Sequence, residues 1–268
     1  MAEPILAAEH LTRRFGGGRT WYGARRPALV AVDDVSLAVA PGTTLGIVGE
    51  SGCGKSTLAR MLTGLIEPSY GTIRLDGRPV TRLAGDDKRR FHQTVQLVFQ
   101  DPLSSLNPRK TVQQILEGPL EALTDLDRNG RRERVRALMD EVGLRPEFID
   151  RYPHEFSGGQ AQRIGIARAM AVEPRLVVLD EPVSALDVSV QAQVLKLFKE
   201  LQARRGLTYL FISHDLAVVE ALSTDVLVMY QGKVVEAGPR AQVFERPTHD
   251  YTRTLLAAVP VPGRRRTA

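Results

Sequence analysis

The sequence predicts an α/β fold with a mainly parallel sheet, an N-terminal antiparallel β layer and an inserted α-helical subdomain. Short apolar runs that suit buried strands alternate with amphipathic helical segments, which is typical of a parallel sheet covered by helices. Residues 1–48 have the patterns of strands and turns rather than of helices. From about residue 102 to 172 the sequence becomes charged and helical, which indicates a block inserted into the α/β core.

Composition limits the class of protein. The 268 residues are 43% hydrophobic with a formal charge of +5, which allows a sizeable core and only a mild basic excess. No apolar run approaches the roughly 18 residues of a membrane span, and no charged start precedes an apolar stretch. The single cysteine, Cys53, excludes an internal disulfide or a cysteine-ligated cluster within one chain. We therefore expect a cytosolic protein without a signal peptide and, lacking a long basic face with interleaved aromatics, without a nucleic-acid partner.

The N-terminal layer is expected to lead into the first strand of the parallel sheet. Residues 35–39 alternate apolar and polar side chains, as a half-buried strand does. Pro41-Gly42 then turns the chain into an apolar strand at 44–48. Residues 16–26 are interpreted as a loop inserted into this layer.

A phosphate-binding motif follows that strand. Residues 49–57, GESGCGKST, fit G-x-x-x-x-G-K-[ST], and apolar residues then recur at helical spacing from Leu58 to Ile66. Glycines let several backbone N–H groups point at one anion, and the helix N-terminus adds partial positive charge. We expect Lys55 to reach the β- and γ-phosphates of a nucleotide and Ser56 to bind Mg²⁺. The expected nucleotide-binding residues here are Gly49, Ser51, Gly52, Cys53, Gly54, Lys55, Ser56 and Thr57.

The remaining core elements are predicted from apolar runs and turn residues. A helix with an apolar stripe at 190–201 is expected to end before Gly206, and Gln231-Gly232 predicts a hairpin turn. The expected strands are 72–75, 95–99, 176–179, 210–213 and the hairpin strands 226–230 and 233–236. In the helical block, residues 112–116 are expected to form the start of one helix, and residues 131–142 a second helix. A third helix is expected to begin just past Ser157.

Two acidic residues follow the strand at 176–179. A buried apolar strand delivers carboxylates at its C-terminal end, where ligands gather in open α/β sheets. We expect Asp180 to hold Mg²⁺ through water and Glu181 to polarise an attacking water. A solvated turn is the alternative, and the spacing after the phosphate-binding motif argues against it.

A second anion-binding pattern occurs at Ser157-Gly158-Gly159-Gln160. It presents a hydroxyl and glycine N–H groups at the positive end of a helix. One nucleotide does not need two such loops from one chain, so we expect this loop to cap the γ-phosphate held by another subunit. Taken alone, the same residues could equally form a simple helix cap.

Taken in chain order, the motifs resemble those of the nucleotide-binding subunits of ATP-binding-cassette (ABC) transporters, over nearly the whole chain. The resemblance implies a P-loop NTPase (RecA-like) core that binds ATP and Mg²⁺ and hydrolyses ATP. It makes Glu181 the general base, lets His214 contact the γ-phosphate, and makes Gln100 a sensor of Mg²⁺ and of the membrane partner. It also implies a signature formed by residues 157–160 and a dimer-contacting loop formed by Ser184, Ala185, Leu186 and Asp187.

The family stacks adenine on an aromatic side chain near the N-terminus. Phe15 matches that position best, while Trp21 and Tyr22 in the inserted loop are alternatives. Ala161 departs from the basic or longer polar residue often found after the signature. We expect a minor effect because this position should not touch phosphate directly.

Two segments indicate the branch of the family. Residues 100–109, QDPLSSLNPR, and 249–256, HDYTRTLL, resemble oligopeptide and dipeptide importers, with Asp250 in place of the usual proline. Nickel importers of the same branch share much of this sequence and are an alternative. A soluble, non-transport ABC ATPase, such as a component of a carbon–phosphorus lyase-type complex, is the other. Neither the cargo nor the choice between identical and paralogous ATPase partners can be derived from this chain.

The resemblance also implies an organisation and a set of partners. The expected parts are an ATPase core at 1–100 and 173–239, a helical signature subdomain at 101–172 and a C-terminal extension at 240–268. The implied partners are a second ATPase subunit, a paralogue being favoured over a copy, two integral membrane permease subunits and, indirectly, a substrate-binding protein. The chain would then lie on the cytoplasmic face of the membrane. The basic run at 264–266 suits a solvated terminus, or weak attraction to anionic lipid.

Overall fold

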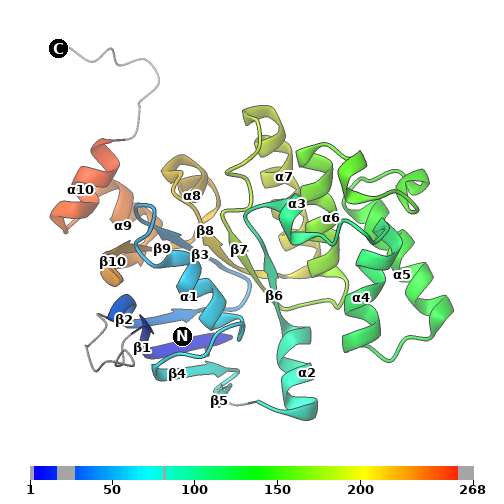
Figure 1. Cartoon of the computed structure of the whole chain (residues 1–268). Coiled ribbons are helices and arrows are strands. Elements are labelled where there is room, and N and C mark those ends of the chain that lie inside the picture. Colours follow the sequence, from blue (N-terminus) through cyan, green and yellow to red (C-terminus); the bar gives the residue numbers. More distant parts are fainter. Residues whose placement is uncertain (1–2, 17–27, 81–82, 259–268) are drawn as a thin grey trace, which may run out of the picture.

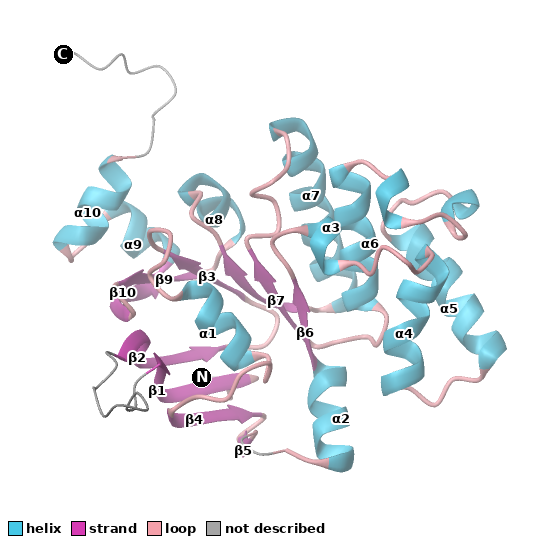
Figure 2. Ribbon diagram, in the orientation of Figure 1, coloured by secondary structure: helices cyan, strands magenta, loops and turns pink. Residues whose placement is uncertain are grey.

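A six-stranded, mainly parallel sheet forms the centre of the molecule (Figures 1 and 2). The structure, a computed structural model, describes residues 3–16, 28–80 and 83–258. Five neighbouring strands of this sheet pair in parallel, and the strand at 233–239 on one edge is antiparallel to its neighbour. The expected α/β class is therefore confirmed. In spatial order the strands are β10 (Lys233–Pro239), β9 (Asp225–Tyr230), β3 (Thr44–Val48), β8 (Thr208–Ile212), β7 (Leu176–Asp180) and β6 (Val95–Val98).

The antiparallel layer is a second sheet, as the sequence indicates. Its strands, in spatial order, are β2 (Ala28–Val39), β1 (Leu6–Gly16), β4 (Tyr70–Leu75) and β5 (Arg78–Pro79). β2 is longer than the predicted 35–39 because a bulge hides its earlier part. Asp34 has φ 55° there, and the buried residues Val32 and Val35 are three apart instead of two. Apart from Gly16, the predicted loop at 16–26 lies outside the described residues.

Some boundaries differ from the predicted ones by one or two residues. β4 begins at Tyr70 rather than 72, β6 ends at Val98 rather than 99, and β8 ends at Ile212 rather than 213. The hairpin between β9 and β10 turns at Gln231 and Gly232 as predicted. Both residues have positive φ, 47° and 83°, which is the turn geometry that matches the twist of paired strands.

Two helices of the inserted block start at side-chain caps that the sequence carries. Thr111 forms a capping box with Gln114 at the start of α4, and Asp127 accepts a hydrogen bond from the Gly130 N–H at the start of α5. α5 therefore starts three residues before the predicted 131. The block comprises α3 (Pro102–Ser105), α4 (Val112–Leu123), α5 (Arg128–Glu141) and α6 (Gly158–Met170), with short 3₁₀ turns at Pro146–Phe148 and Pro153–Glu155.

Further helices surround the central sheet (Figure 2). α7 (Val188–Arg205) ends just before Gly206, whose φ of 63° terminates the helix as predicted. α2 was not predicted because Phe91 is its only buried residue, so it shows no apolar stripe. The remaining helices are α1 (Lys55–Leu62), α2 (Gly85–Thr94), α7 (Val188–Arg205), α8 (Leu216–Leu222), α9 (Arg240–Glu245) and α10 (Asp250–Ala257). Within the described ranges, no helix combines the length and the apolar character that crossing a bilayer requires.

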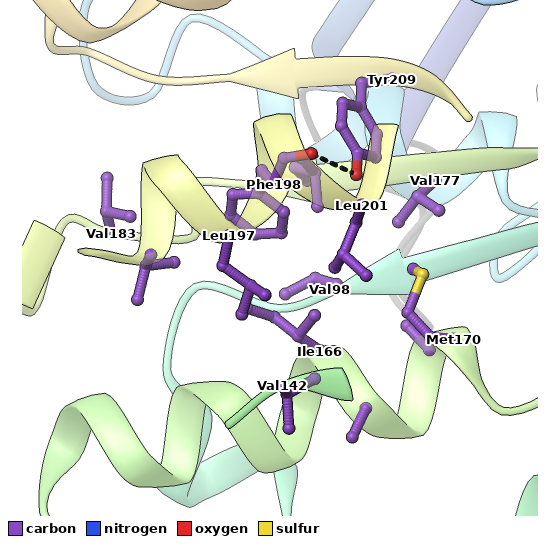
Figure 3. Close-up of a cluster of buried hydrophobic side chains, with 14 of the residues drawn as sticks. Val98, Val142, Ile166, Met170, Val177, Val183, Leu197, Phe198, Leu201 and Tyr209 are labelled. Carbon is purple, nitrogen blue, oxygen red and sulfur yellow. Dashed lines mark hydrogen bonds between the residues drawn. The ribbon is translucent and has the colours of Figure 1, made fainter. Parts of the chain in front are cut away.

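Two apolar cores lie on opposite faces of the central sheet. Because successive strand residues point to opposite faces, Val177 and Leu179 of β7 join one core and Leu176 and Val178 the other. The first core reaches into the helical block, and Figure 3 shows side chains of α6, α7 and three strands meeting there. The second core packs α1 and the antiparallel layer against the sheet.

One ion pair fastens the helical block to α7. Arg205 donates two hydrogen bonds of 2.6 Å to the Glu141 carboxylate, and both side chains are largely shielded from solvent. This bidentate geometry fixes direction as well as distance. The block and the core are thus joined by packing and by a directed polar contact.

We predict that, in the contact between α7 and β8, packing contributes much more to the free energy of unfolding than the hydrogen bond does. The Tyr209 hydroxyl donates to the Phe198 carbonyl at 3.0 Å, and the rings meet edge to face (Figure 3). Phe198→Ala should lower the free energy of unfolding by about 3–5 kcal/mol, because Phe198 is fully buried. Tyr209→Phe should lower it by only about 1 kcal/mol. Urea unfolding of both variants measures the two values, and equal losses would contradict this prediction.

Candidate functional site

Four parallel strands end side by side at one edge of the central sheet. They are β3, β8, β7 and β6, and each is followed by residues that the sequence analysis selected. Loops at the carboxyl ends of neighbouring parallel strands converge, and ligands of open α/β sheets bind there. The candidate site is therefore assembled from segments that are far apart in the chain.

The loop after β3 has the backbone of a phosphate cradle. Gly49 has φ 151° and Gly54 φ 105°, and a Cβ atom on either would lie 2.2 Å from the Met229 carbonyl or 2.1 Å from the Ala31 carbonyl. Only glycine fits at these two positions. α1 starts at the next residue, Lys55, with no side chain capping its first N–H groups. Those donors and the helix dipole can therefore face an anion.

The Lys55 amine is buried against the loop it follows. Its Nζ donates hydrogen bonds to the Gly49 carbonyl at 2.7 Å and to the Glu50 carbonyl at 2.8 Å. Lys55 is only 4% exposed. The loop carbonyls thus hold a compact positive charge at the mouth of the cradle.

Two oxygen donors lie together at the base of the cradle. The Ser56 hydroxyl donates to Oδ1 of Asp180 at 3.0 Å, across 124 residues of sequence. Burial raises the pKa of Asp180, an effect that the bond from Ser56 partly offsets and the neighbouring Glu181 charge reinforces. A hydroxyl and a carboxylate are the ligands that a hard divalent cation prefers, so these residues fit Mg²⁺.

One oxygen of Glu181 collects two polar contacts. Gln100 Nε2 donates to its Oε2 at 3.0 Å, and Nδ1 of His214 lies 3.1 Å from the same atom. Glu181 itself has φ 47°, and its N–H donates to the Ile212 carbonyl at 2.9 Å. This left-handed turn at the end of β7 directs the side chain away from the strand. The structure therefore brings Gln100, Glu181 and His214 together, as the sequence analysis expected of catalytic residues.

The segment 157–160 forms a capping box at the start of α6. The Ser157 hydroxyl accepts from the Gln160 N–H at 3.4 Å, and the Gln160 side chain accepts from the Ser157 N–H at 3.1 Å. A Cβ on Gly159 would lie 2.4 Å from a methyl group of Val190, so this glycine is also required for close packing against α7. In the part of the chain that the structure describes, no hydrogen bond joins this segment to the phosphate cradle.

The loop at 184–187 links the Glu181 turn to α7. The Ser184 hydroxyl donates to the Glu181 carbonyl at 3.1 Å, and Asp187 stands at the N-cap of α7. Leu186 approaches Gly158 of the capping box, and Val188, directly after the loop, is 83% exposed.

Phe15 lies near the end of β1 and is 37% exposed. The Arg13 guanidinium stands 4.8 Å from the centre of its ring and donates to the Glu67 carbonyl at 2.7 Å. The ring is thus backed by a fixed cation. The alternatives Trp21 and Tyr22 lie outside the described residues, so the choice among the three aromatics stays open. Ala161 is fully buried, in keeping with the expectation that it does not touch phosphate.

The sequence analysis missed one contact to the cradle. The Tyr251 hydroxyl, on α10, accepts a hydrogen bond from the Glu50 N–H at 3.1 Å. The two residues are 201 positions apart, and no motif links them. The contact arises because the C-terminal segment folds back onto the cradle, and this arrangement is visible only in the structure.

Two family models match the chain. One described as "ABC transporter" matches residues 32–184, more than half of the chain, and one described as "Oligopeptide/dipeptide transporter, C-terminal region" matches residues 235–268. The chain is 51% identical to the oligopeptide transport ATP-binding protein OppF of Salmonella typhimurium, with 91% of this chain and 74% of OppF covered. It is 52% identical to the dipeptide transport ATP-binding protein DppF of Haemophilus influenzae, with 96% of this chain and 78% of DppF covered.

Solved structures with the same fold include two cassette proteins. One is cbiO1 from Clostridium perfringens, described as part of the ABC transporter complex cbiONQ. It has a TM-score of 0.75 and 28% identity, with 91% of this chain and 92% of that chain covered. The other is a dimeric ATP-binding cassette in a post-hydrolysis state bound to ADP and Pi. It has a TM-score of 0.78 and 26% identity, with 88% of this chain and 99% of that chain covered.

We predict that Cys53 reacts slowly with maleimides at pH 7 and faster as the pH rises beyond the ordinary thiol range. Burial raises the pKa of Cys53, although Lys55 lowers it in part, so the reactive thiolate is scarce at neutral pH. Cys53 is also only 6% exposed, within the cradle. The labelling rate, followed by mass spectrometry, should fall further when nucleotide is present, and labelling should block nucleotide binding.

The urea-unfolded chain provides the control for this measurement, since its thiol should label at the rate of an ordinary cysteine. Fast labelling of the native chain at pH 7, or a labelled chain that still binds nucleotide normally, would contradict the prediction.

Proposed function

Because the chain belongs to the ABC transporter family, as an ATP-binding subunit, we propose that it hydrolyses ATP to drive uptake of di- and oligopeptides through membrane permease subunits. One observation carries the proposal. The Glu181 carboxylate is held by Gln100 and His214 beside the Ser56–Asp180 pair and the phosphate cradle. This is a base, a pair of metal ligands and an anion site at one sheet edge, which is what phosphoryl transfer to water needs.

Each residue of the site then has a distinct task. Lys55 and N–H groups of the loop other than that of Glu50 bind the phosphates, and Glu181 accepts a proton from the attacking water. The contacts from Gln100 and His214 aim the carboxylate oxygen, and His214 is in position to contact the γ-phosphate. Ser56 and Asp180 would hold Mg²⁺, which when bound neutralises charge on the phosphate oxygens.

The segment 157–160 is proposed to serve the nucleotide of a second subunit. Its hydroxyl and glycine N–H groups stand at the positive end of α6, which is 13 residues long, and they make no hydrogen bond to the cradle among the described residues. The exposed Val188 beside the 184–187 loop supplies apolar area for that contact. Two subunits would close head to tail over two ATP molecules.

Coupling to the membrane is proposed to run through Gln100 and the helical block. Gln100 contacts the catalytic carboxylate and leads directly into α3, and α3 packs against α6. A shift of the block relative to the core would therefore move the side chain that aims Glu181. We propose that residues 1–100 and 173–239 act as the ATPase core, 101–172 as the signature subdomain and 240–268 as the extension. The chain would lie peripherally on the cytoplasmic face of the membrane.

A peptide cargo is favoured over nickel and over a soluble complex. The support is the match of residues 235–268 to the oligopeptide/dipeptide C-terminal model and the names of the relatives. Purification of the chain from membranes tests transport against the soluble alternative. Integral permease subunits should co-purify, and a complex without any membrane subunit would favour the carbon–phosphorus lyase-type alternative.

We predict that Glu181→Gln binds ATP but lowers turnover by at least about a hundredfold, because the base is lost while the polar contacts remain. The ATP-bound variant should also dimerise more stably, since hydrolysis no longer opens the dimer. Phosphate release and size-exclusion chromatography with ATP measure the two effects. The matched control is Glu200→Gln, an exposed change on α7 that should leave turnover as in the wild type. Normal turnover by Glu181→Gln would rule out Glu181 as the base.

We also predict that Ser157→Arg abolishes turnover while ATP affinity changes less than about twofold. The bulky side chain would keep a second subunit from closing over its nucleotide. Ser157→Ala serves as the control, because it removes the cap of α6, worth about 1 kcal/mol, without adding bulk. It should keep much more turnover than Ser157→Arg. Loss of ATP binding in the arginine variant would argue against a partner-facing loop.

A further inference from the structure

The C-terminal extension touches the phosphate cradle directly. α10 lies beside α9 and β10, at the end of the molecule that is drawn in red in Figure 1. Its Tyr251 hydroxyl accepts a hydrogen bond from the Glu50 N–H at 3.1 Å. Glu50 is the second residue of the cradle, so a segment outside the cassette core reaches the nucleotide-binding loop.

The peptide group that Tyr251 contacts is also the one that holds Lys55. The N–H of the Gly49–Glu50 peptide donates to Tyr251, and its carbonyl accepts from Lys55 Nζ at 2.7 Å. A trans peptide is planar, with its N–H and C=O on opposite sides. Fixing the direction of one group therefore fixes the other. Within the described residues this peptide is a rigid bridge between Tyr251 and Lys55.

The backbone around this peptide is open to alternative orientations without such a contact. Gly49 has φ 151°, and glycine, which has no Cβ atom, has access to many other backbone conformations. Gly232 contributes a second brace, because its N–H donates to the Cys53 carbonyl at 3.0 Å. That brace holds the far part of the loop, whereas the N–H of the Gly49–Glu50 peptide is held by Tyr251.

The Tyr251 ring is itself well seated. It lies against the Tyr230 ring, with ring centroids 4.2 Å apart. Together with Leu255 and Leu256, it packs against the first core, the one that reaches into the helical block. Among the residues that the structure describes, the Tyr230 hydroxyl accepts a hydrogen bond only from the Gln231 side chain, at 3.2 Å. The two tyrosines thus share a ring contact, but only one of them reaches the cradle.

A carboxylate on β10 fastens the start of the extension. Glu236 accepts hydrogen bonds from the N–H and hydroxyl of Thr248, at 2.8 and 2.9 Å, and from the His249 N–H at 3.1 Å. Burial raises the pKa of Glu236, but the hydrogen bonds from these donors, together with the nearby Thr252 hydroxyl, outweigh this effect and lower the pKa to about 2. The Glu236 carboxylate is therefore ionised, and accepts these hydrogen bonds, across the physiological pH range. α10 is held on the core by a polar clamp and an apolar face.

We propose that Tyr251 is a positioning residue for the nucleotide site, whose hydroxyl orients the Gly49–Glu50 peptide and through it the Lys55 amine. This rests on the proposed ATPase function. The extension then belongs to the machinery that binds the phosphates, and it does not serve only as an appendage for docking partners.

A double-mutant cycle on the full-length chain tests the bridge. The readout is the dissociation constant of the fluorescent nucleotide TNP-ATP, so no turnover is needed. Tyr251→Phe removes the hydroxyl and keeps the ring. It should weaken binding about three- to tenfold when Lys55 is present, the range for one lost hydrogen bond. In a Lys55→Ala background the same change should weaken binding less than about twofold, because the amine that the peptide orients is gone.

Tyr230→Phe is the matched control, since it removes the neighbouring hydroxyl that contacts only Gln231, and it should change affinity less than about twofold in both backgrounds. Thermal unfolding midpoints of all variants verify folding. Should Tyr251→Phe not fold, Glu236→Gln loosens the same segment with the hydroxyl in place and should show the same dependence on Lys55.

Equal losses in both backgrounds would mean that Tyr251 only stabilises the fold, and an unchanged affinity with Lys55 present would mean that the hydroxyl has no role. Either result overturns the inference and leaves the proposed function standing. A wild-type chain that binds no TNP-ATP would instead remove the proposed function itself.

Discussion

The parallel pairing of β3, β8, β7 and β6 is the constraint on which the site depends. These strands are short, and residues of three of them are fully or almost fully buried on both faces, so their chemistry can appear only where they end. Parallel order places those ends at one edge. The phosphate cradle, the acidic pair, Gln100 and His214 then meet, although Lys55 and His214 lie 159 positions apart in the chain. No single segment of the chain could form this site alone.

The same sheet also explains why the helical block can act on the site. Alternate residues of β7 feed two separate cores, and the block shares only one of them. Arg205 and Glu141 add a directed polar tie between the block and α7. Two further ion pairs join the block to the rest of the core, Arg89–Asp125 at 2.6 Å and Arg134–Glu173 at 3.4 Å. A movement of the block would therefore act on the site through a shared core and several directed polar contacts.

Much of this could be predicted from the sequence, because local patterns carried it. The cradle at 49–57, the acid pair after β7 and the helix start at Ser157 are contiguous motifs, and the structure has them where the motifs indicated. α2 was missed because a single buried Phe91 leaves no periodicity, and half of β2 was missed because the bulge at Asp34 breaks its alternation. The shared contact of Gln100 and His214 on one oxygen of Glu181 was not predictable either, since it depends on a left-handed turn that a non-glycine residue adopts.

The contact from α10 to the cradle constrains how the extension can vary. Tyr251 sits in the first turn of a helix that the Glu236 clamp anchors only two or three residues earlier. Each residue of an α-helix rotates the side-chain direction by roughly 100°, so inserting or deleting one residue between clamp and tyrosine would swing the phenol off the loop. Substitutions such as the aspartate at 250 leave that phase intact. The segment from residue 248 to residue 251 should therefore tolerate substitutions far better than insertions or deletions.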